Sequence, residues 1–211
     1  MGPPGSGKGT LATRLSQIID ISVIATGDEL RNQLAAGTAL GKKAKEFMNA
    51  GKLVPNEVIM EMVRELFQKS DLTNGFLLDG FPRTIAQAEM LEEFLDEKDM
   101  GLEKVFFLVI PKDVLIDRLS SRRVCVHCGL THSISGHTTD EEMICVECNS
   151  ELVQRDDDLP EVIEKRIDVY NEQTKPLVDH YKEKGILYEI DGGIDGVEIK
   201  ANMIVDAIKA I

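Results

Sequence analysis

Apolar positions along the chain follow two spacings, one typical of helices and the other of buried strands. After Pro55 the apolar side chains recur every three or four residues, which predicts an amphipathic helix. The run KVFFLVI at 104–110 is almost continuously apolar, as expected of a strand with both faces buried. Shorter apolar runs predict further strands at 21–26, 75–80 and 186–193.

Helical patterns separate the predicted strands. We expect helices at 9–19, 26–37, 112–121 and 195–211, and a long one beginning near residue 158. Asp28 and Asp158 are the expected caps of two of them, and Pro160 and Glu161 suit the first turn after Asp158. Alternating strands and helices predict an α/β fold, with a parallel sheet covered by helices on both faces.

The segment 122–154 interrupts this alternation. It is poor in large aliphatic residues, rich in Ser, Thr, His and Glu, and contains all four cysteines of the chain. A segment of this composition inside an α/β pattern predicts an inserted subdomain rather than another strand–helix unit.

The overall charge excludes several classes of partner. The formal net charge is −13, so the chain is a poor general binder of nucleic acid or anionic membranes. No apolar run approaches the roughly 18 to 20 residues of a membrane span, and the first residues do not have the pattern of a signal peptide. We therefore expect a cytoplasmic protein without nucleic-acid or membrane partners.

The first ten residues, MGPPGSGKGT, contain the spacing of a phosphate-binding loop. Gly2 and Gly7 are separated by four residues, Lys8 follows, and a helical pattern begins directly afterwards. Glycines let backbone amides surround phosphate oxygens, while the lysine and the helix N-terminus add positive charge. The hydroxyl expected near Mg²⁺ is that of Thr10, one position later than usual.

Asp79 ends the predicted strand 75–80. Ligands of parallel α/β sheets bind at the carboxyl ends of the strands. A carboxylate there can hold Mg²⁺ through its water shell. Beside a phosphate loop, Asp79 is therefore a candidate for a magnesium site together with Thr10.

Arginines lie near the predicted element ends of this acidic chain. Phosphoryl transfer requires alignment of the two substrates and groups that neutralise the phosphate oxygens, and arginine does this with two parallel hydrogen bonds. We take these arginines as candidates for that role rather than as ordinary surface residues. They are Arg31, Arg83, Arg122, Arg123, Arg155 and Arg166.

The cysteines form two CxxC pairs, Cys125/Cys128 and Cys145/Cys148. This pattern predicts a tetrahedral Zn²⁺ site, and four thiolates leave no open position, which indicates a structural ion. Redox chemistry of the pairs is a minor alternative. A nucleic-acid-binding zinc ribbon is disfavoured, because no Lys or Arg lies between Cys128 and Cys148. Alternative ligands are His127, His132 and His137.

These motifs together resemble the adenylate kinases over almost the whole chain. The phosphate loop, TGDELR, GKLVP, LLDGFPRT, RLSSRR, the CxxC pairs, QRDDD, KRIDVYNEQTKPL and DGG occur in that family's order and spacing. The chain looks like the bacterial type with a long, zinc-containing lid. The resemblance implies the P-loop nucleoside-monophosphate kinase fold and the reaction ATP + AMP ⇌ 2 ADP with Mg²⁺, in a monomer.

The resemblance also implies domains and roles for single residues. The core would be 1–24, 55–121 and 155–211, with an AMP-binding subdomain at 25–54 and the lid at 122–154. The ATP contacts would be Gly5, Ser6, Gly7, Lys8, Gly9, Thr10, Arg118, Arg122, Thr131, His132, Gly193 and Ile194. The AMP contacts would be Thr26, Arg31, Lys52, Leu53, Val54, Gly80, Phe81, Pro82, Arg83, Gln87, Arg155 and Arg166.

Within those sets the resemblance assigns the chemistry to a few side chains. Asp157 and Asp158 would clamp the closed lid, and the Phe81–Pro82 bond is expected to be cis. The expected catalytic residues are Lys8, Arg83, Arg122, Arg155 and Arg166.

The sequence departs from the family pattern in two places. The lid interior reads THSISGHTTDEE, so His132 stands where an aromatic side chain is usual. Only Met1 precedes the phosphate loop, where the family has the central strand of its sheet. We therefore expect the two neighbouring strands to lack a ladder partner, and the chain to be less stable than one extended by about five apolar residues.

Two alternative functions are consistent with the same sequence features. The chain could be a UMP/CMP kinase or another kinase of the same class. It could also be a nucleotide- or zinc-binding homologue whose catalysis is impaired by the absent strand.

Overall fold

The computed structural model describes residues 1–134, 143–194 and 196–210. Its helices are α1 (Lys8–Ile18), α2 (Thr26–Ala35), α3 (Ala39–Asn49), α4 (Asn56–Lys69), α5 (Ile85–Asp96), α6 (Lys112–Ser121), α7 (Pro160–Val169), α8 (Leu177–Glu183) and α9 (Val197–Lys209). Its strands are β1 (Ser22–Ala25), β2 (Phe76–Asp79), β3 (Val105–Val109), β4 (Arg122–Cys125), β5 (Thr131–Ser133), β6 (Leu152–Val153) and β7 (Leu187–Asp191). The strands and helices expected from the apolar spacing are all present.

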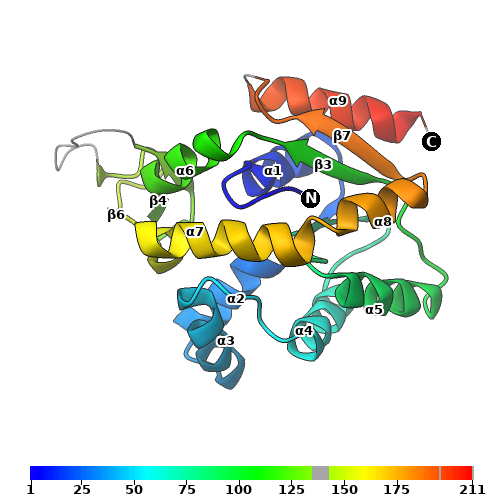
Figure 1. The fold of residues 1–211 in the computed structure, drawn as a ribbon, viewed down its shortest axis with the longest axis horizontal. Coiled ribbons are helices and arrows are strands. Elements are labelled where there is room, and N and C mark those ends of the chain that lie inside the picture. Colours follow the sequence, from blue (N-terminus) through cyan, green and yellow to red (C-terminus); the bar gives the residue numbers. More distant parts are fainter. Residues whose placement is uncertain (135–142, 195, 211) are drawn as a thin grey trace.

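Two parallel strand pairs form the centre of the fold. β1 pairs with β2, and β3 pairs with β7. In Figure 1, α9 lies along one side of the β3–β7 pair, and α7 and α8 run along the other. α1 packs on α9, and α5 packs on α8. Helices therefore cover both sides of the strand layer, as the α/β pattern predicts.

The expected single sheet is divided in two. Within the described residues, β1–β2 and β3–β7 are separate two-stranded sheets. Met1 lies against β3: its amino group donates to the carbonyl of Phe106, and the amide of Leu108 donates to the carbonyl of Met1 over 3.0 Å. The expectation that the neighbouring strands lack a ladder partner is therefore confirmed.

Two expected helix caps are absent. Asp28 does not cap α2, which begins at Thr26 without a side-chain cap, and instead Asp28 pairs with Arg31. Asp158 does not cap α7, which follows Leu159 without a side-chain cap. In both cases the carboxylate has an arginine within reach, and a charged partner binds a carboxylate more strongly than a backbone amide does.

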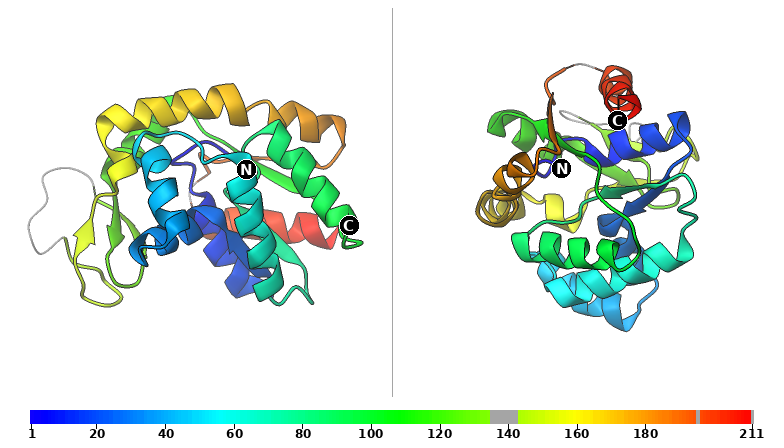
Figure 2. Two further views of the ribbon diagram at one scale, coloured as in Figure 1. Left: turned by 90° about the horizontal axis from the view of Figure 1, so that it is seen from below. Right: turned by 90° about the vertical axis from the view of Figure 1, so that its right-hand side faces the viewer.

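The inserted segment has its own small sheet and core. β5, β4 and β6 form an antiparallel sheet in that order, and Cys125, Cys145 and Leu152 are buried together beside it. Figure 2 shows these strands projecting from one side of the molecule, away from α4 and α5. The separation agrees with the prediction of an inserted unit.

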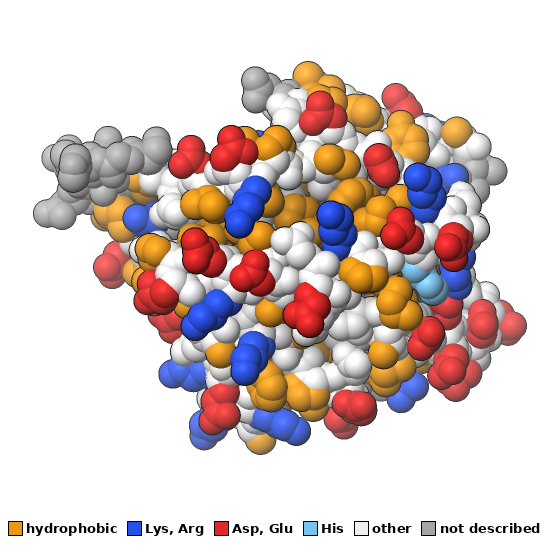
Figure 3. Space-filling view, in the orientation of Figure 1, with side chains coloured by type: hydrophobic (Ala, Val, Ile, Leu, Met, Phe, Trp, Pro, Cys, Tyr) orange, Lys and Arg blue, Asp and Glu red, His pale blue; other side chains and the backbone are white. Residues whose placement is uncertain are grey.

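The distribution of charged side chains on the surface can be compared with what a nucleic-acid-binding protein requires. On the face drawn in Figure 3, acidic and basic side chains are mixed, and the basic ones form no continuous stripe. None of the helices that the structure describes has the length and apolarity needed to cross a bilayer.

Candidate functional site

The phosphate loop folds into a ring around the ammonium group of Lys8. Gly5 and Gly7 have φ angles of 82° and 87°, a left-handed conformation that suits glycine, and α1 begins directly after Gly7. Lys8 Nζ donates to the carbonyls of Gly2 and Pro3, each over 2.8 Å, and to Ser6 Oγ over 3.2 Å. The loop thus holds the lysine charge where a phosphate group would approach the start of the helix.

Lys8 is surrounded by other charged groups. Its pKa is lowered to about 7, mainly by burial and to a lesser extent by the charges of Arg83, Arg166 and Arg122, against the opposing effect of Asp79. These arginines come from three distant parts of the chain. The structure therefore brings the loop lysine and three of the candidate arginines into one electrostatic environment.

Asp79 faces the first turn of α1. It ends β2 and lies opposite Ala25 of β1, and a Cβ atom at Gly9 would come within 3.4 Å of its Oδ2. Thr10 is exposed on the same turn. A carboxylate at the carboxyl end of a strand and a hydroxyl beside the phosphate loop have the oxygen chemistry that Mg²⁺ prefers.

Asp158, expected from the sequence as a helix cap and a lid clamp, is the centre of an ion-pair network. Its side chain is fully buried, and Oδ2 accepts from Arg122 Nε over 2.6 Å. Its Oδ1 accepts from Arg166 over 2.7 Å, and Asp157 lies 3.1 Å from the same guanidinium. The aspartates therefore fix two candidate catalytic arginines in place.

Arg83 is held from several sides near β2. Its Nε donates to the carbonyl of Gly80 over 2.7 Å, and Thr26 Oγ1 donates to that same carbonyl over 3.1 Å. The Phe81–Pro82 bond is cis, as expected. Burial lowers the pKa of Arg83, with the charge of Arg166 as the next cause.

Gln87 anchors the backbone of this segment. The buried Gln87 side chain accepts from the amide of Arg83 over 2.7 Å and donates to Asn56 Oδ1 over 3.0 Å. Thr174 Oγ1 donates to the carbonyl of Arg83 over 2.8 Å. Asn56 and Thr174 were not identified from the sequence, where no motif distinguishes them from other polar residues.

The Arg155 side chain has a buried atom, Nε, that makes no hydrogen bond among the described residues. Its pKa is lowered to about 10, first by burial and then by nearby Arg31 and Arg122, against the opposing effect of Asp157 and Asp158. Burial would raise the pKa of Asp157, but the surrounding arginines hold it below its usual range. Positive groups thus outnumber the acids that face them, which favours a polyanionic ligand here.

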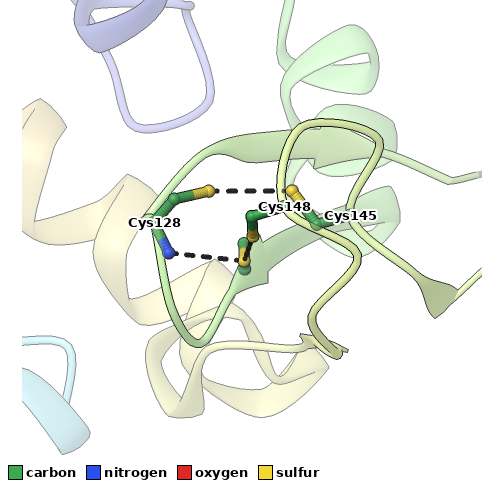
Figure 4. Close-up of side chains that lie close together, drawn as sticks. Cys128, Cys145 and Cys148 are labelled. Carbon is green, nitrogen blue, oxygen red and sulfur yellow. Dashed lines mark hydrogen bonds between the residues drawn. The ribbon is translucent and has the colours of Figure 1, made fainter.

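The four cysteine sulfurs lie close enough to share a metal ion. All four are within 4.8 Å of one another, with separations of 3.3 Å for Cys125–Cys148 and 3.6 Å for Cys128–Cys145. In Figure 4 the side chains of Cys128, Cys145 and Cys148 lie close together, with their sulfurs on the inner side of the cluster. Thiolates about 2.3 Å from a tetrahedral zinc ion would lie roughly 3.8 Å apart, so the donor set fits Zn²⁺.

The local backbone favours the thiolate form of Cys125. The amide of Cys128 and then that of His127 hydrogen-bond to Cys125 Sγ and lower the pKa of that thiol to about 6, against the raising effect of burial. Thiolate is the form that binds metal. Among the histidines named as alternative ligands, His127 and His132 lie outside the cysteine cluster, and His137 lies outside the described residues.

Comparison with known proteins identifies the family. A sequence model described as "Adenylate kinase" matches residues 1–186. The chain belongs to the adenylate kinase family. It is 46% identical over 212 residues to an adenylate kinase of Archaeoglobus fulgidus, covering 100% of this chain and 98% of that protein. It is 47% identical over 209 residues to one of Desulfitobacterium hafniense, covering 99% of this chain and 96% of that protein.

The remaining residues named from the adenylate kinase resemblance lie in four places. Thr131 and His132 are in β5, opposite Val124 and Arg123 of β4, and His132 Nε2 is buried without a partner among the described residues. Lys52, Leu53 and Val54 connect α3 to α4, and Gly193 and Ile194 follow β7. Arg118 is in the last turn of α6. Arg123 donates to the carbonyls of Ser120 and Arg122, so its guanidinium is bonded to its own chain segment.

Proposed function

We propose that the protein catalyses reversible phosphoryl transfer from MgATP to AMP, giving two ADP. The observation that carries this proposal is the meeting of the phosphate loop with arginines from distant segments at the carboxyl end of β2. Such a surplus of positive charge is suited to two nucleotides whose phosphates must approach each other. Membership of the adenylate kinase family supports adenine nucleotides as the pair.

The ATP side of the site is the phosphate loop. Its amides from Gly5 to Thr10 and the ammonium of Lys8 would bind the outer phosphates, and Arg122 would add a second charge. Mg²⁺, when bound with ATP, neutralises charge on the transferred phosphoryl group, and Thr10 and Asp79 would hold it through water. Further ATP contacts would come from Arg118, Thr131, His132, Gly193 and Ile194.

The AMP side lies between α2 and the segment after β2. Arg31 and Arg83 would bind the AMP phosphate, and Thr26 holds the carbonyl of Gly80 beside them. Gln87 uses its oxygen and one amide hydrogen within the protein, which leaves one N–H for the adenine edge. The connection at 52–54 and residues Gly80, Phe81 and Pro82 would form the remaining walls.

The transfer step needs alignment more than covalent participation by the protein. Arg83, Arg155 and Arg166 would contact oxygens shared between donor and acceptor. Asp157 and Asp158 keep the arginine side chains oriented before the nucleotides arrive. Arg155, which has an unpartnered Nε, is the charge most ready to accept a phosphate oxygen.

We divide the chain into a core and two parts that would move relative to it. The core would be 1–24, 55–121 and 155–211, with the AMP-binding subdomain at 25–54 and the lid at 122–154. Closure of the lid would exclude water, which otherwise competes as phosphoryl acceptor. The cysteine cluster would bind one structural Zn²⁺ that holds the lid together, in a cytoplasmic monomer.

A coupled assay of ADP formation tests the proposal. AMP, UMP, CMP and GMP are offered separately with MgATP, and Lys8→Ala serves as the control. We expect rapid turnover with AMP only, and a loss of about 10²-fold or more in Lys8→Ala. Equal activity in the two proteins, or none in either, contradicts the proposal, and a preference for UMP or CMP assigns the alternative acceptor.

A further inference from the structure

The four cysteines of the inserted β4–β5–β6 unit meet in pairs that cross between the two CxxC motifs. We call residues 125–128 the first knuckle and residues 145–148 the second. Cys125 Sγ lies 3.3 Å from Cys148 Sγ, and Cys128 Sγ lies 3.6 Å from Cys145 Sγ. Figure 4 marks the second of these contacts with a dashed line between the sulfurs. Both contacts therefore join one knuckle to the other.

Each crossing pair joins a cysteine that solvent reaches to a buried one. Cys128 is exposed and Cys148 is half-buried, whereas Cys125 and Cys145 are buried, with exposed fractions of 2% and 0%. A small oxidant in solution therefore has access to one thiol of each pair. The other thiol is shielded but adjacent, which is the arrangement in which a neighbour resolves an oxidised cysteine as a disulfide.

Local hydrogen bonds favour thiolate in the Cys125–Cys148 pair. The hydroxyl and then the amide of Ser150 hydrogen-bond to Cys148 and lower the pKa of that thiol, against the opposing effects of Cys125 and burial. Backbone amides of the first knuckle lower the pKa of Cys125. Because the thiolate is the nucleophile in cysteine chemistry, we expect this pair to react before Cys128 and Cys145.

Disulfides across the knuckles would affect the inserted unit differently from disulfides within them. The contact of Cys125 with Cys148 spans 23 residues of chain, and that of Cys128 with Cys145 spans 17. A disulfide within one CxxC motif would close only a very short loop and leave the two knuckles unlinked. The small buried cluster of the unit includes Cys125, Cys145 and Leu152, so crossing disulfides would keep both knuckles in that cluster.

We propose that the four thiols form a redox-active site, separate from the nucleotide site, that a peroxide converts into two disulfides joining the knuckles, with release of the bound zinc. The inference rests on the structural Zn²⁺ of the proposed function, but it does not depend on phosphoryl transfer. The oxidisable pairs are Cys125 with Cys148 and Cys128 with Cys145.

Each pair is oxidised in two balanced steps. The accessible thiolate attacks one oxygen of the peroxide, the O–O bond breaks, and a sulfenic acid forms with release of hydroxide. The partner thiolate then attacks the sulfenic sulfur, the S–S bond forms, and a second hydroxide leaves. Protons from solvent convert both hydroxides to water. Two electrons pass from each pair to one hydrogen peroxide, so two peroxides and four protons give two disulfides and four waters.

Peroxide treatment of the intact, zinc-loaded protein tests the proposal. Released Zn²⁺ is measured with the chromogenic chelator 4-(2-pyridylazo)resorcinol, and disulfides are located by mass spectrometry after the remaining thiols are alkylated. We expect one zinc to be released as the two crossing disulfides form, and dithiothreitol with added zinc to reverse the change. Disulfides confined to the CxxC motifs, or thiols that stay reduced in excess peroxide, would overturn the proposal.

Single variants assign the pairs. Cys148→Ser should form only the Cys128–Cys145 disulfide, and Cys128→Ser only the Cys125–Cys148 disulfide. His127→Ala is the control and should be oxidised like the unchanged protein, because its side chain lies outside the sulfur cluster. A disulfide between Cys125 and Cys128 in Cys148→Ser would overturn the crossing assignment.

Limited proteolysis tests whether the disulfides hold the knuckles together. The oxidised, zinc-free protein should be cleaved within 122–154 more slowly than the reduced, chelator-treated protein, because covalent links constrain the unfolded unit. Equal cleavage of the two forms would overturn the joining of the knuckles.

The ADP assay separates this inference from the proposed function. A protein that forms ADP from MgATP and AMP but does not form crossing disulfides contradicts the redox site alone. A protein that forms the crossing disulfides but was purified without zinc contradicts the structural zinc and supports the pairing of the thiols.

Discussion

At the scale of single residues, a few acidic side chains hold a larger number of arginines in place in the site. Asp158 is buried completely and touches two guanidinium groups. A buried carboxylate of this kind stabilises mainly because its removal would leave its partners uncompensated. Arg122 and Arg166, two candidate catalytic residues, are therefore positioned by ion pairs that are present without nucleotide.

We predict that Asp158→Asn lowers the free energy of unfolding by about 3 kcal/mol, because Arg122 and Arg166 lose their shared counter-charge. Urea unfolding measures the effect. The matched control is Glu65→Gln, which removes an exposed ion pair with Lys69 and should cost no more than about 0.5 kcal/mol. Equal losses in the two variants would show that Asp158 is not the centre of the network.

Lys8 should take up a proton when a polyphosphate binds. Its pKa of about 7 in the free protein lies below the ordinary value, and a bound polyanion favours the charged form and raises it. At pH 8.5 binding should therefore draw protons from solution, and at pH 6, where Lys8 is already charged, it should draw almost none.

Calorimetry of ATP binding in buffers with different ionisation enthalpies measures this uptake. Lys8→Arg, which stays charged at both pH values, is the control and should show no uptake from this position. The same uptake in Lys8→Arg at pH 8.5 would assign the proton to another group.

At the scale of elements, the inserted β4–β5–β6 unit has little apolar material of its own. Its buried cluster consists of Cys125, Cys145 and Leu152, with a few partly buried neighbours. So small a core rarely offsets the conformational entropy of ordering its chain. A metal ion is the kind of cross-link that would make this unit stable.

We predict one tightly bound zinc per reduced chain, and less than about half an equivalent in Cys145→Ser, because Cys145 is a buried member of the four-sulfur set. Metal analysis after purification without chelator measures both. His127→Ala is the control and should keep its zinc, since His127 lies outside the cluster. Loss of zinc in His127→Ala but not in Cys145→Ser would reassign the ligands.

At the scale of the whole molecule, the site must gather positive charge around two nucleotides and also open again to release its products. The arginines come from α2, the segment after β2, β4, the segment after β6 and α7. Parts that gather this much charge around two nucleotides must separate again to release product. Opening of the lid is therefore expected to limit turnover.

Rapid-quench experiments test this expectation. With enzyme in excess over ATP, the single-turnover rate should exceed the steady-state kcat, because it includes phosphoryl transfer but not product release. A single-turnover rate no faster than kcat would place the slow step at or before the chemistry.

The sequence by itself determined the local elements and the motifs. Apolar spacing predicted β1, β2, β3 and β7 and most of the helices, because an element that buries one face repeats its apolar side chains with a regular period. The phosphate loop and the CxxC pairs were recognisable, because their chemistry depends on neighbours close in sequence. α3 was not predicted, although Leu40, Ala44, Phe47 and Met48 lie at helical spacing along it and pack against the core.

Only the tertiary structure decided which distant groups meet. Asp158 was expected to cap a helix, but in the fold two arginines 36 and 8 residues away compete for it. Gln87 bonds to Asn56 across 31 residues of chain. That β2 and β3 line one cavity became visible only when folding had brought the two strands together. Sequence spacing does not predict such pairings, because the side chains involved are distant in the sequence and meet only when the chain folds.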